Sequence, residues 1–180
     1  MVKLYYRFDK HSFITKDLKD YKYLGKGHSG QVYLMPNGRV IKIFKDKDTC
    51  REEYNILKAV ERSPHFPKVY AVGDHYMIRD YVSGVNIEDY INPITLDQRF
   101  VNNIVNLSEE LKGLGFKKIE MRFPHVFVQK DGNLMLIDPR ESFKKKIPYP
   151  ISFIKSLKKI GLAGRFFKIL KEERPDVNWR

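Results

Sequence analysis

A lysine stands in the middle of an otherwise apolar segment, VIKIF, at residues 40–44. From residue 20 onward apolar and polar side chains alternate, and Asn37-Gly38 is the dipeptide that tight hairpin turns prefer. These patterns predict three antiparallel strands, of which the third carries Lys42. Because a buried ammonium group is costly unless it meets an anion, we expect a carboxylate or a phosphate beside Lys42.

The segment after this strand predicts a helix of about a dozen residues. Thr49 and Glu52 have the spacing of a capping box, which would begin the helix. Glu53 lies on the helix face expected to turn toward the sheet, with Glu52 as its competitor. We predict that Glu53 holds Lys42, an arrangement that can aim the amine at phosphates; a surface ion pair is the alternative.

Two short strands around Gly73-Asp74 complete a predicted five-stranded antiparallel sheet within residues 1–82. A mainly helical pattern follows in residues 83–180, beginning with a short helix near residues 86–91. An apolar stripe from Phe100 to Leu114 predicts a further helix, with Thr95 and Gln98 as a second capping box. The predicted fold class is therefore α+β, with an amino-terminal lobe at 1–82 and a minimal carboxy-terminal lobe at 83–180.

A hairpin turned by Asp131-Gly132 and two basic amphipathic helices split by Gly161 and Gly164 are predicted for the rest of the chain. The tail, residues 141–180, contains eleven Lys or Arg and four Asp or Glu, so it carries +7 of the net charge of +12. An excess of positive charge attracts phosphorylated or acidic partners. Nucleic acid or acidic lipid is therefore one expected partner of this tail, and a solvated face on two packed helices is the alternative.

Glycines and a valine lie between the first two predicted strands, in the stretch LGKGHSGQV, as Gly25, Gly27, Gly30 and Val32. Glycine allows backbone amides to approach phosphate oxygens closely. A Rossmann loop would need a helix after the glycines, and a Walker A loop would need lysine after Gly30, where Gln31 stands. The pattern favours either a plain hairpin or a flap that lies over a nucleotide.

The single cysteine and the amino-terminal segment limit the compartment. Cys50 cannot form an internal disulfide, which is typical of a reducing environment, and we expect it to be a packing residue. The first residues, MVKLYYRFDK, have neither the apolar core of a signal peptide nor the length of a membrane span. These features predict a cytoplasmic protein without a transmembrane segment.

Taken in order, these motifs resemble those of the protein kinase-like superfamily. GKGHSGQV resembles the glycine-rich loop GxGxxGxV, VIKIF the strand with the phosphate-binding lysine, and EYNIL the next helix with its glutamate. HYMIRDYVSG resembles the fifth strand and the hinge, with Arg79 at the gatekeeper position. The resemblance, from about residue 21 to residue 140, implies a two-lobed fold that binds ATP, with the main chain of Asp80, Tyr81 and Val82 against the adenine edge.

The resemblance also assigns residues in the second half of the chain. LIDPR falls where the family has its DFG motif, so Asp138 would bind Mg²⁺. Alignment of HVFV with the end of the catalytic loop H-R-D-x-x-x-x-N places Glu120 at the catalytic aspartate and His125 at the metal-binding asparagine. Glutamate keeps the charge, whereas His125 is a poor ligand for Mg²⁺, which prefers oxygen. A shifted register would place Met121 at the aspartate position instead.

Three functions remain open at this point. The first is a small atypical kinase, of bacterial or RIO-like type, in which Lys42, Glu120 and Asp138 transfer the ATP γ-phosphate to a hydroxyl of a protein or a small molecule. The second is a pseudokinase that binds nucleotide and acts as a scaffold or regulator. The third is a basic module that binds nucleic acid or a membrane. The APE motif of ordinary protein kinases is absent after Asp138, so we expect no conventional peptide platform.

Overall fold

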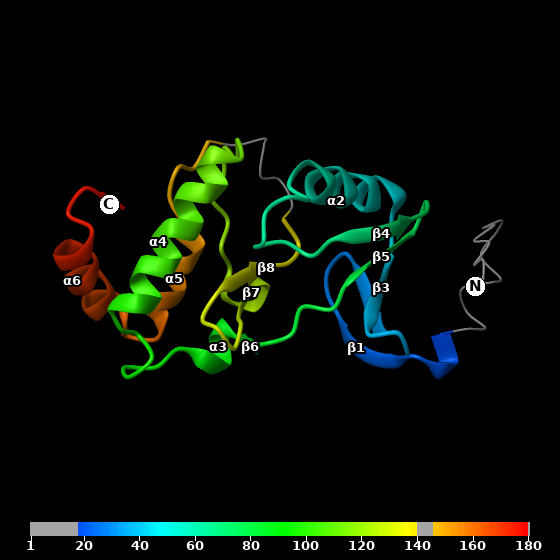
Figure 1. Cartoon of the computed structure of the whole chain (residues 1–180), viewed down its shortest axis with the longest axis horizontal. Helices are drawn as coiled ribbons and strands as arrows, with labels where there is room; N and C mark the ends of the chain where they lie inside the picture. Colours follow the sequence, from blue (N-terminus) through cyan, green and yellow to red (C-terminus); the bar gives the residue numbers. More distant parts are fainter. Residues whose placement is uncertain (1–17, 140–145, 180) are drawn as a thin grey trace. The chain divides into compact units, whose positions relative to one another are not determined.

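The computed structural model describes residues 18–139 and 146–179 (Figure 1). These residues form two compact units. Unit 1 contains residues 18–58 and 68–81, and unit 2 contains residues 59–67, 82–139 and 146–179. Each unit has its own β-sheet. The first part of the predicted basic tail, residues 141–145, lies outside the described residues.

Unit 1 contains one antiparallel sheet and one long helix. Its strands are β1 (Lys22–Lys26), β2 (Gly30–Leu34), β3 (Arg39–Phe44), β4 (Val69–Val72) and β5 (Tyr76–Asp80). Their order in the sheet is β1-β2-β3-β5-β4, and all neighbouring strands are antiparallel. A short 3-10 helix, η1 (Leu18–Asp20), precedes the sheet, and α2 (Lys47–Ala59) follows β3. The predicted five-stranded sheet with one helix after its third strand is therefore confirmed.

The central strand β3 presents different side chains to the two faces of this sheet. Successive residues of a strand point to opposite faces. Ile41 lies opposite Ile78 of β5, and both pack with Met35 in an apolar cluster on one face. Lys42 therefore points to the other face, where α2 supplies its partner.

Unit 2 combines a small sheet with helices. The sheet has the order β6-β7-β8, from β6 (Val85–Asn86), β7 (Val126–Val128) and β8 (Leu134–Leu136). The helices are α3 (Ile87–Tyr90), α4 (Gln98–Gly113), η2 (Phe123–His125), α5 (Ile151–Lys159) and α6 (Ala163–Glu173). The sequence does not predict the two-residue strand β6, and Gly164 lies inside α6 instead of between the helices. No helix in the described part of the chain is long and apolar enough to cross a membrane.

The apolar core of unit 2 joins α4 to the carboxy-terminal helices. α4 packs on α6 and β8, and α5 packs on α6 (Figure 1). Aromatic rings extend this core: Phe153 of α5 meets Phe166 of α6 edge-on, with ring centroids 5.5 Å apart. Phe166 in turn stacks on Trp179, with centroids 5.9 Å apart. The described part of the basic tail is therefore integrated into unit 2.

The helix α2 begins at a different residue from the predicted cap. The Asp46 carboxylate accepts hydrogen bonds from the backbone amides of Asp48 (2.9 Å) and Thr49 (3.1 Å). Thr49 lies inside the first turn of α2, and its hydroxyl also bonds to Asp46. The capping box expected at Thr49 and Glu52 is therefore wrong, because an aspartate, a stronger N-cap than threonine, stands three residues earlier.

The start of α4 differs from the prediction in the same way. Its N-cap is Asp97, whose Oδ1 accepts a hydrogen bond from the backbone amide of Phe100 at 2.8 Å. The Thr95 hydroxyl belongs to the preceding turn, where it accepts from the Asn92 amide and donates to the Tyr90 carbonyl. The second capping box, Thr95 with Gln98, is therefore also wrong.

The side chain of Cys50 is buried in α2, with Sγ 3.5 Å from the carbonyl oxygens of Gly73 and Tyr76. Burial, and next to it the charge of Glu53, raises the pKa of the Cys50 thiol to about 11. The thiol is therefore protonated at neutral pH and unreactive. These contacts suit the packing role expected from the sequence.

Replacement of the α4 cap gives a direct test of the assignment. Asp97→Ala is expected to lower the free energy of unfolding of unit 2 by about 1 kcal/mol, because the Phe100 amide loses its acceptor. Gln98→Ala is the matched control and should change it by less than about 0.5 kcal/mol. Urea unfolding followed by the fluorescence of Trp179, the single tryptophan of the chain, measures both. A larger effect of Gln98→Ala would restore the capping box.

Candidate functional site

Lys42 and Glu53 form a buried ion pair in unit 1. Lys42 Nζ lies 2.8 Å from Glu53 Oε2, and the two side chains are 2% and 0% exposed. The ring centroid of Phe44, on the same face of β3, lies 4.8 Å from the amine. The structure thus brings together the lysine and the carboxylate that the sequence paired, and Glu53 makes this bond, not its competitor Glu52.

One row of the sheet contains three of the predicted nucleotide-binding residues. Gly25 of β1 lies opposite Val32 of β2, and Val32 lies opposite Lys42 of β3. Residues in register occupy the same face of a sheet. The half-buried Val32 therefore separates the glycine turn from Lys42 on that face.

The three glycines of the β1–β2 turn have different structural causes. A Cβ on Gly30 would lie 1.8 Å from the Ile43 carbonyl oxygen, so the pairing of β2 with β3 requires glycine there. A Cβ on Gly25 or Gly27 would meet no described atom within 4 Å, and neither glycine has a positive φ. The fold of unit 1 therefore explains Gly30 alone. Close approach of the backbone to a ligand would explain Gly25 and Gly27.

The segment expected against adenine begins at the end of β5. The Asp80 carboxylate accepts hydrogen bonds from the Tyr70 hydroxyl (2.7 Å) and the Lys68 amide (3.0 Å). The Asp80 carbonyl accepts one from Arg79 Nη1 at 3.1 Å. A carbonyl oxygen has two lone pairs, so the Arg79 side chain takes one of them and, among the described residues, the other can still accept a hydrogen bond. Val82 belongs to unit 2, where it is 6% exposed.

In unit 2 the β7–β8 ladder brings His125 and Asp138 to the same end. Val126 pairs with Leu136, and the Ile137 amide donates to the His125 carbonyl at 2.9 Å. Asp138 follows directly and has a φ of 55°. No other non-glycine residue in the described ranges has a positive φ. Aspartate tolerates this left-handed conformation, and residues held in it cluster at functional sites. The backbone thus fixes Asp138 in an unusual orientation.

Glu120 lies in the extended chain before η2, beside basic side chains. Lys118 Nζ is 2.9 Å from Glu120 Oε2, and Arg122 Nε is 3.6 Å from Oε1. Burial alone would raise the pKa of Glu120, but hydrogen bonds from Ser152 and Lys118, with the charges of Lys118 and Arg122, lower it below its ordinary value. The carboxylate is therefore ionised at neutral pH, and its lowered pKa makes it a weak proton acceptor.

Two neighbours of Glu120, Lys118 and Ser152, are absent from the sequence prediction. Lys118 and Arg122 flank Glu120 at a spacing of two, which puts side chains of an extended chain on the same side, so the signal is present in KIEMR. Ser152 belongs to α5, far along the chain, and has no local signature. Met121 is fully buried, so the shifted register would place a core methionine at the position of the base.

The donor atoms fit a magnesium ion that arrives with phosphate. Mg²⁺ usually binds through one or two carboxylates together with substrate phosphate oxygens, and Asp138 offers one carboxylate. His125 offers a nitrogen, which does not fit this ion. Within residues 18–139 and 146–179, no group of three or more His, Cys, Asp or Glu could hold a metal. Magnesium at Asp138 would therefore need phosphate oxygens among its ligands.

Comparisons with known proteins bear on the fold. No protein-family model matches the chain. Over 138 residues the chain is 20% identical to a Bacillus subtilis (strain 168) protein described as "Putative serine/threonine-protein kinase YrzF"; the match covers 73% of this chain and 63% of that protein. The chain thus spans less than two thirds of this relative. The solved structure of the Cydia pomonella granulovirus kinase PK-1 matches with a TM-score of 0.53 and 21% identity, over 69% of this chain and 55% of the viral one.

The chain has a protein kinase-like fold. Its sheet order, the helix after the third strand and the β7–β8 hairpin agree with the similarity to the viral kinase structure. The α+β class and the resemblance stated from the motifs are therefore confirmed. The roles of the individual residues follow from neither comparison and remain predictions.

A double-mutant cycle tests the buried ion pair. Lys42→Met or Glu53→Leu alone is expected to lower the free energy of unfolding of unit 1 by about 3–5 kcal/mol, because each leaves one buried charge without its partner. The double variant should lose clearly less than the sum of the two. Urea unfolding followed by circular dichroism measures all three, with Lys45→Met, an exposed lysine after β3, as control. Additive single effects would contradict a coupled pair.

The pH dependence of stability tests the environment of Glu120. Its folded pKa lies below the ordinary value of 4.5, so its stabilisation is present above that pH and is lost as the pH falls through the lower folded value. Glu120→Gln is therefore expected to make the free energy of unfolding less dependent on pH in acid. Glu88→Gln, at an exposed position of α3, should retain the wild-type slope. Parallel curves for Glu120→Gln and the wild type would refute the assignment.

Proposed function

We propose that this chain is an atypical kinase-like phosphotransferase that transfers the terminal phosphoryl group of ATP to a hydroxyl. The buried Lys42–Glu53 pair, in register with Val32 and the glycine turn, is the observation that carries the proposal. A lysine held by a carboxylate, in the same row of the sheet as Gly25, a glycine that the fold does not require, suits the binding of a polyphosphate. Serine or threonine of a protein is the preferred acceptor class, and a small-molecule hydroxyl is the alternative.

The residues of unit 1 would bind the nucleotide. Lys42 contacts phosphate oxygens, and Glu53 fixes the direction of its amine. The backbone at Gly25 and Gly27 covers the phosphates, and Gly30 keeps the turn close to β3. The remaining lone pair of the Asp80 carbonyl binds the adenine edge, with the Val32 side chain against the base. The main chain of Val82, a residue of unit 2, is the other proposed contact of the adenine edge.

The residues of unit 2 would serve the transfer. Asp138 holds Mg²⁺, which neutralises charge on the phosphates when bound. His125 stays outside the metal coordination and keeps Asp138 in place through the backbone bond to Ile137. Glu120 positions the acceptor hydroxyl by accepting a hydrogen bond from it, because phosphoryl transfer depends mainly on positioning and electrostatics.

A pseudokinase is the second candidate, and the contacts of Glu120 favour it. Its carboxylate has Lys118 at 2.9 Å and a hydrogen bond with Ser152, so less of its charge is available to an acceptor. In this alternative the same residues bind nucleotide, and the chain acts as a scaffold or regulator. The third candidate, a basic module for nucleic acid or a membrane, depends on the carboxy-terminal helices alone.

Incubation with labelled ATP, magnesium and a mixed protein acceptor tests the phosphotransferase proposal. Asp138→Asn is expected to lower the transfer rate at least about 100-fold, because it removes the metal ligand. Asp89→Asn changes the same charge at an exposed position of α3 and should leave the rate unchanged. Equal label with wild type and Asp138→Asn would refute enzymatic transfer by this site.

Thermal unfolding with and without ATP and magnesium separates the alternatives. Under the phosphotransferase proposal the wild type is stabilised and transfers label, and Gly27→Val loses both effects while its melting temperature without ligand is retained. Thermal stabilisation by ATP and magnesium without transfer of label would favour the pseudokinase over the enzyme. No stabilisation by nucleotide would overturn both.

A further inference from the structure

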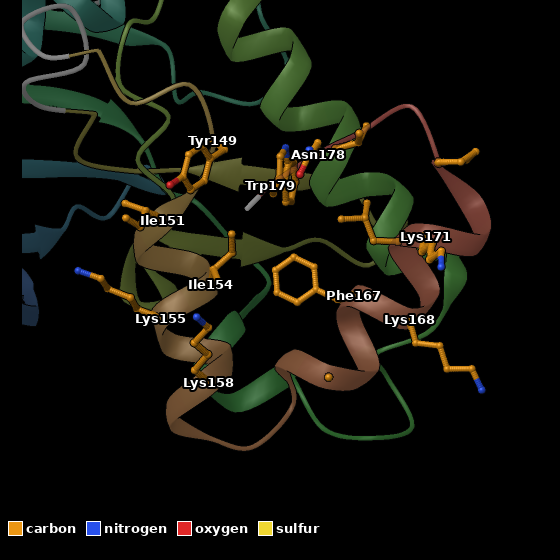
Figure 2. Close-up of a pocket in the computed structure, with 14 residues that line it drawn as sticks. Tyr149, Ile151, Ile154, Lys155, Lys158, Phe167, Lys168, Lys171, Asn178 and Trp179 are labelled. Carbon is orange, nitrogen blue, oxygen red and sulfur yellow. The ribbon is translucent and has the colours of Figure 1, made fainter.

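A large pocket lies entirely within unit 2, between α5, α6 and residues 175–179 (Figure 2). Its volume is about 1010 Å³, at the upper end of the range of about 300–1,000 Å³ for ligand pockets. In Figure 2 the Phe167 ring lies in the middle of the lining residues, with Ile154 of α5 on one side. The apolar lining consists mainly of Ile151, Ile154, Phe167, Leu170, Val177 and Trp179.

Lysines surround this apolar lining on two helices. Lys155 and Lys158 come from α5, and Lys168 and Lys171 come from α6; all four are exposed, and none of the lining residues is acidic. In Figure 2 the amines of Lys155 and Lys168 point outward on opposite sides of the pocket. A spacing of three puts both lysines of each helix on one face. The pocket therefore combines an apolar interior with a positive rim.

Two acidic residues of the same region, Glu173 and Asp176, make contacts away from the pocket. Glu173 accepts a hydrogen bond from Asn102 of α4 at 3.2 Å. Arg174 binds Glu109 of α4 (2.7 Å) and Asp176 (2.8 Å). These contacts direct Glu173 to α4 and Asp176 to Arg174. Glu172, the other carboxylate of α6, is exposed and does not line the pocket, so the charged residues of the lining are all lysines.

The aliphatic lining favours an acyl chain over nucleic acid bases. Proteins that bind single-stranded nucleic acid stack its bases on accessible aromatic side chains. Trp179 is only 4% exposed, because Phe166 covers its ring at an interplanar angle of 14°. Phe167 is half-buried, and Ile154 and Leu170 are buried in the wall. Hydrocarbon fits this surface better than a stack of bases.

Exposed isoleucines lie next to the same basic region. Ile160, in the turn between α5 and α6, is 47% exposed and follows Lys158 and Lys159. Ile94 is 87% exposed, and its loop lies beside the start of α6, because Arg165 Nε donates to the Leu96 carbonyl at 3.0 Å. Apolar side chains among lysines are typical of surfaces that lie in the headgroup region of a membrane.

We propose that this pocket binds an acidic phospholipid at a membrane surface. The lysines at the rim bind the anionic headgroup, an acyl chain enters the apolar interior beside Phe167, and Ile160 enters the headgroup region. The inference concerns unit 2 alone and does not depend on the proposed phosphotransferase activity.

Vesicle binding of the whole chain tests the charge at the rim. The probes are vesicles of phosphatidylcholine and vesicles of equal parts phosphatidylcholine and phosphatidylglycerol. We expect sedimentation with the acidic vesicles only. Lys158→Gln/Lys168→Gln should weaken this binding about 30-fold, because each lysine near an acidic surface contributes about a fivefold factor. Lys112→Gln/Lys130→Gln removes the same charge at exposed positions outside the pocket and should change binding less than about threefold. Equal losses in both double variants would overturn the proposal.

Quenching of Trp179 tests whether an acyl chain enters the pocket. Trp179 is the single tryptophan and lines the pocket. Phosphatidylglycerol with brominated acyl chains should quench its fluorescence, and Phe167→Ala, with its fold checked by circular dichroism, should alter the extent of quenching. Binding to acidic vesicles without quenching would show that the protein is held at the vesicle surface by charge alone. That result would overturn the proposal that the pocket binds an acyl chain. Salt-sensitive binding of single-stranded RNA at the same lysines, without vesicle binding, would replace lipid by nucleic acid.

Discussion

The ammonium group of Lys42 and the carboxylate of Glu53 lie 2.8 Å apart with almost no exposed surface. Transfer of either charge from water into the protein costs several kcal/mol, and mutual attraction offsets this cost only when the geometry is good. β3 and α2 must therefore keep fixed positions, because a shift of the helix would leave a buried charge without its partner. An apolar pair of similar size could fill the same volume without loss of stability, so a buried ion pair is by itself weak evidence for a stabilised sheet.

The electrostatics of unit 2 differ from those of unit 1. In unit 1 the ammonium group of Lys42 is paired with one carboxylate, that of Glu53. In unit 2 the carboxylate of Glu120 is surrounded by Lys118, Arg122 and Ser152. The same surroundings that keep Glu120 ionised make it a poor base. Under the proposed phosphotransferase activity, transfer at Glu120 would therefore depend on position and charge more than on proton abstraction. Asp138, two residues after the end of β8 and with a positive φ, would provide a charge in a defined position.

The sheet of unit 1 and its buried ion pair could be predicted because both depend on short-range patterns. Alternation defines the strands, and a lysine within an apolar strand needs a partner on the next element. The first residues of the helices could not be predicted, because motif spacing does not show which polar side chain forms the N-cap. Thr95 makes its hydrogen bonds within the turn before α4, and Asp97 is the N-cap. The environment of Glu120 depends on Ser152 of α5, a contact between distant parts of the chain. The strand β6 has only two residues, too few to show the alternation of apolar and polar side chains that identifies a strand.

The carboxy-terminal segment combines a structural task with a surface of one charge. Phe153, Phe166 and Trp179 close the core of unit 2, so this segment cannot be removed without exposing that core. Helices that only needed a solvated face could intersperse acidic and basic residues, which would add favourable pairs between successive turns. From residue 151 to residue 171 there are six Lys or Arg and no Asp or Glu. Of the carboxylates that follow, Glu173 contacts α4, and Asp176 binds Arg174, which also binds Glu109 of α4. Repulsion among these cations is unfavourable for the isolated chain, and an anionic ligand at the pocket rim would relieve it.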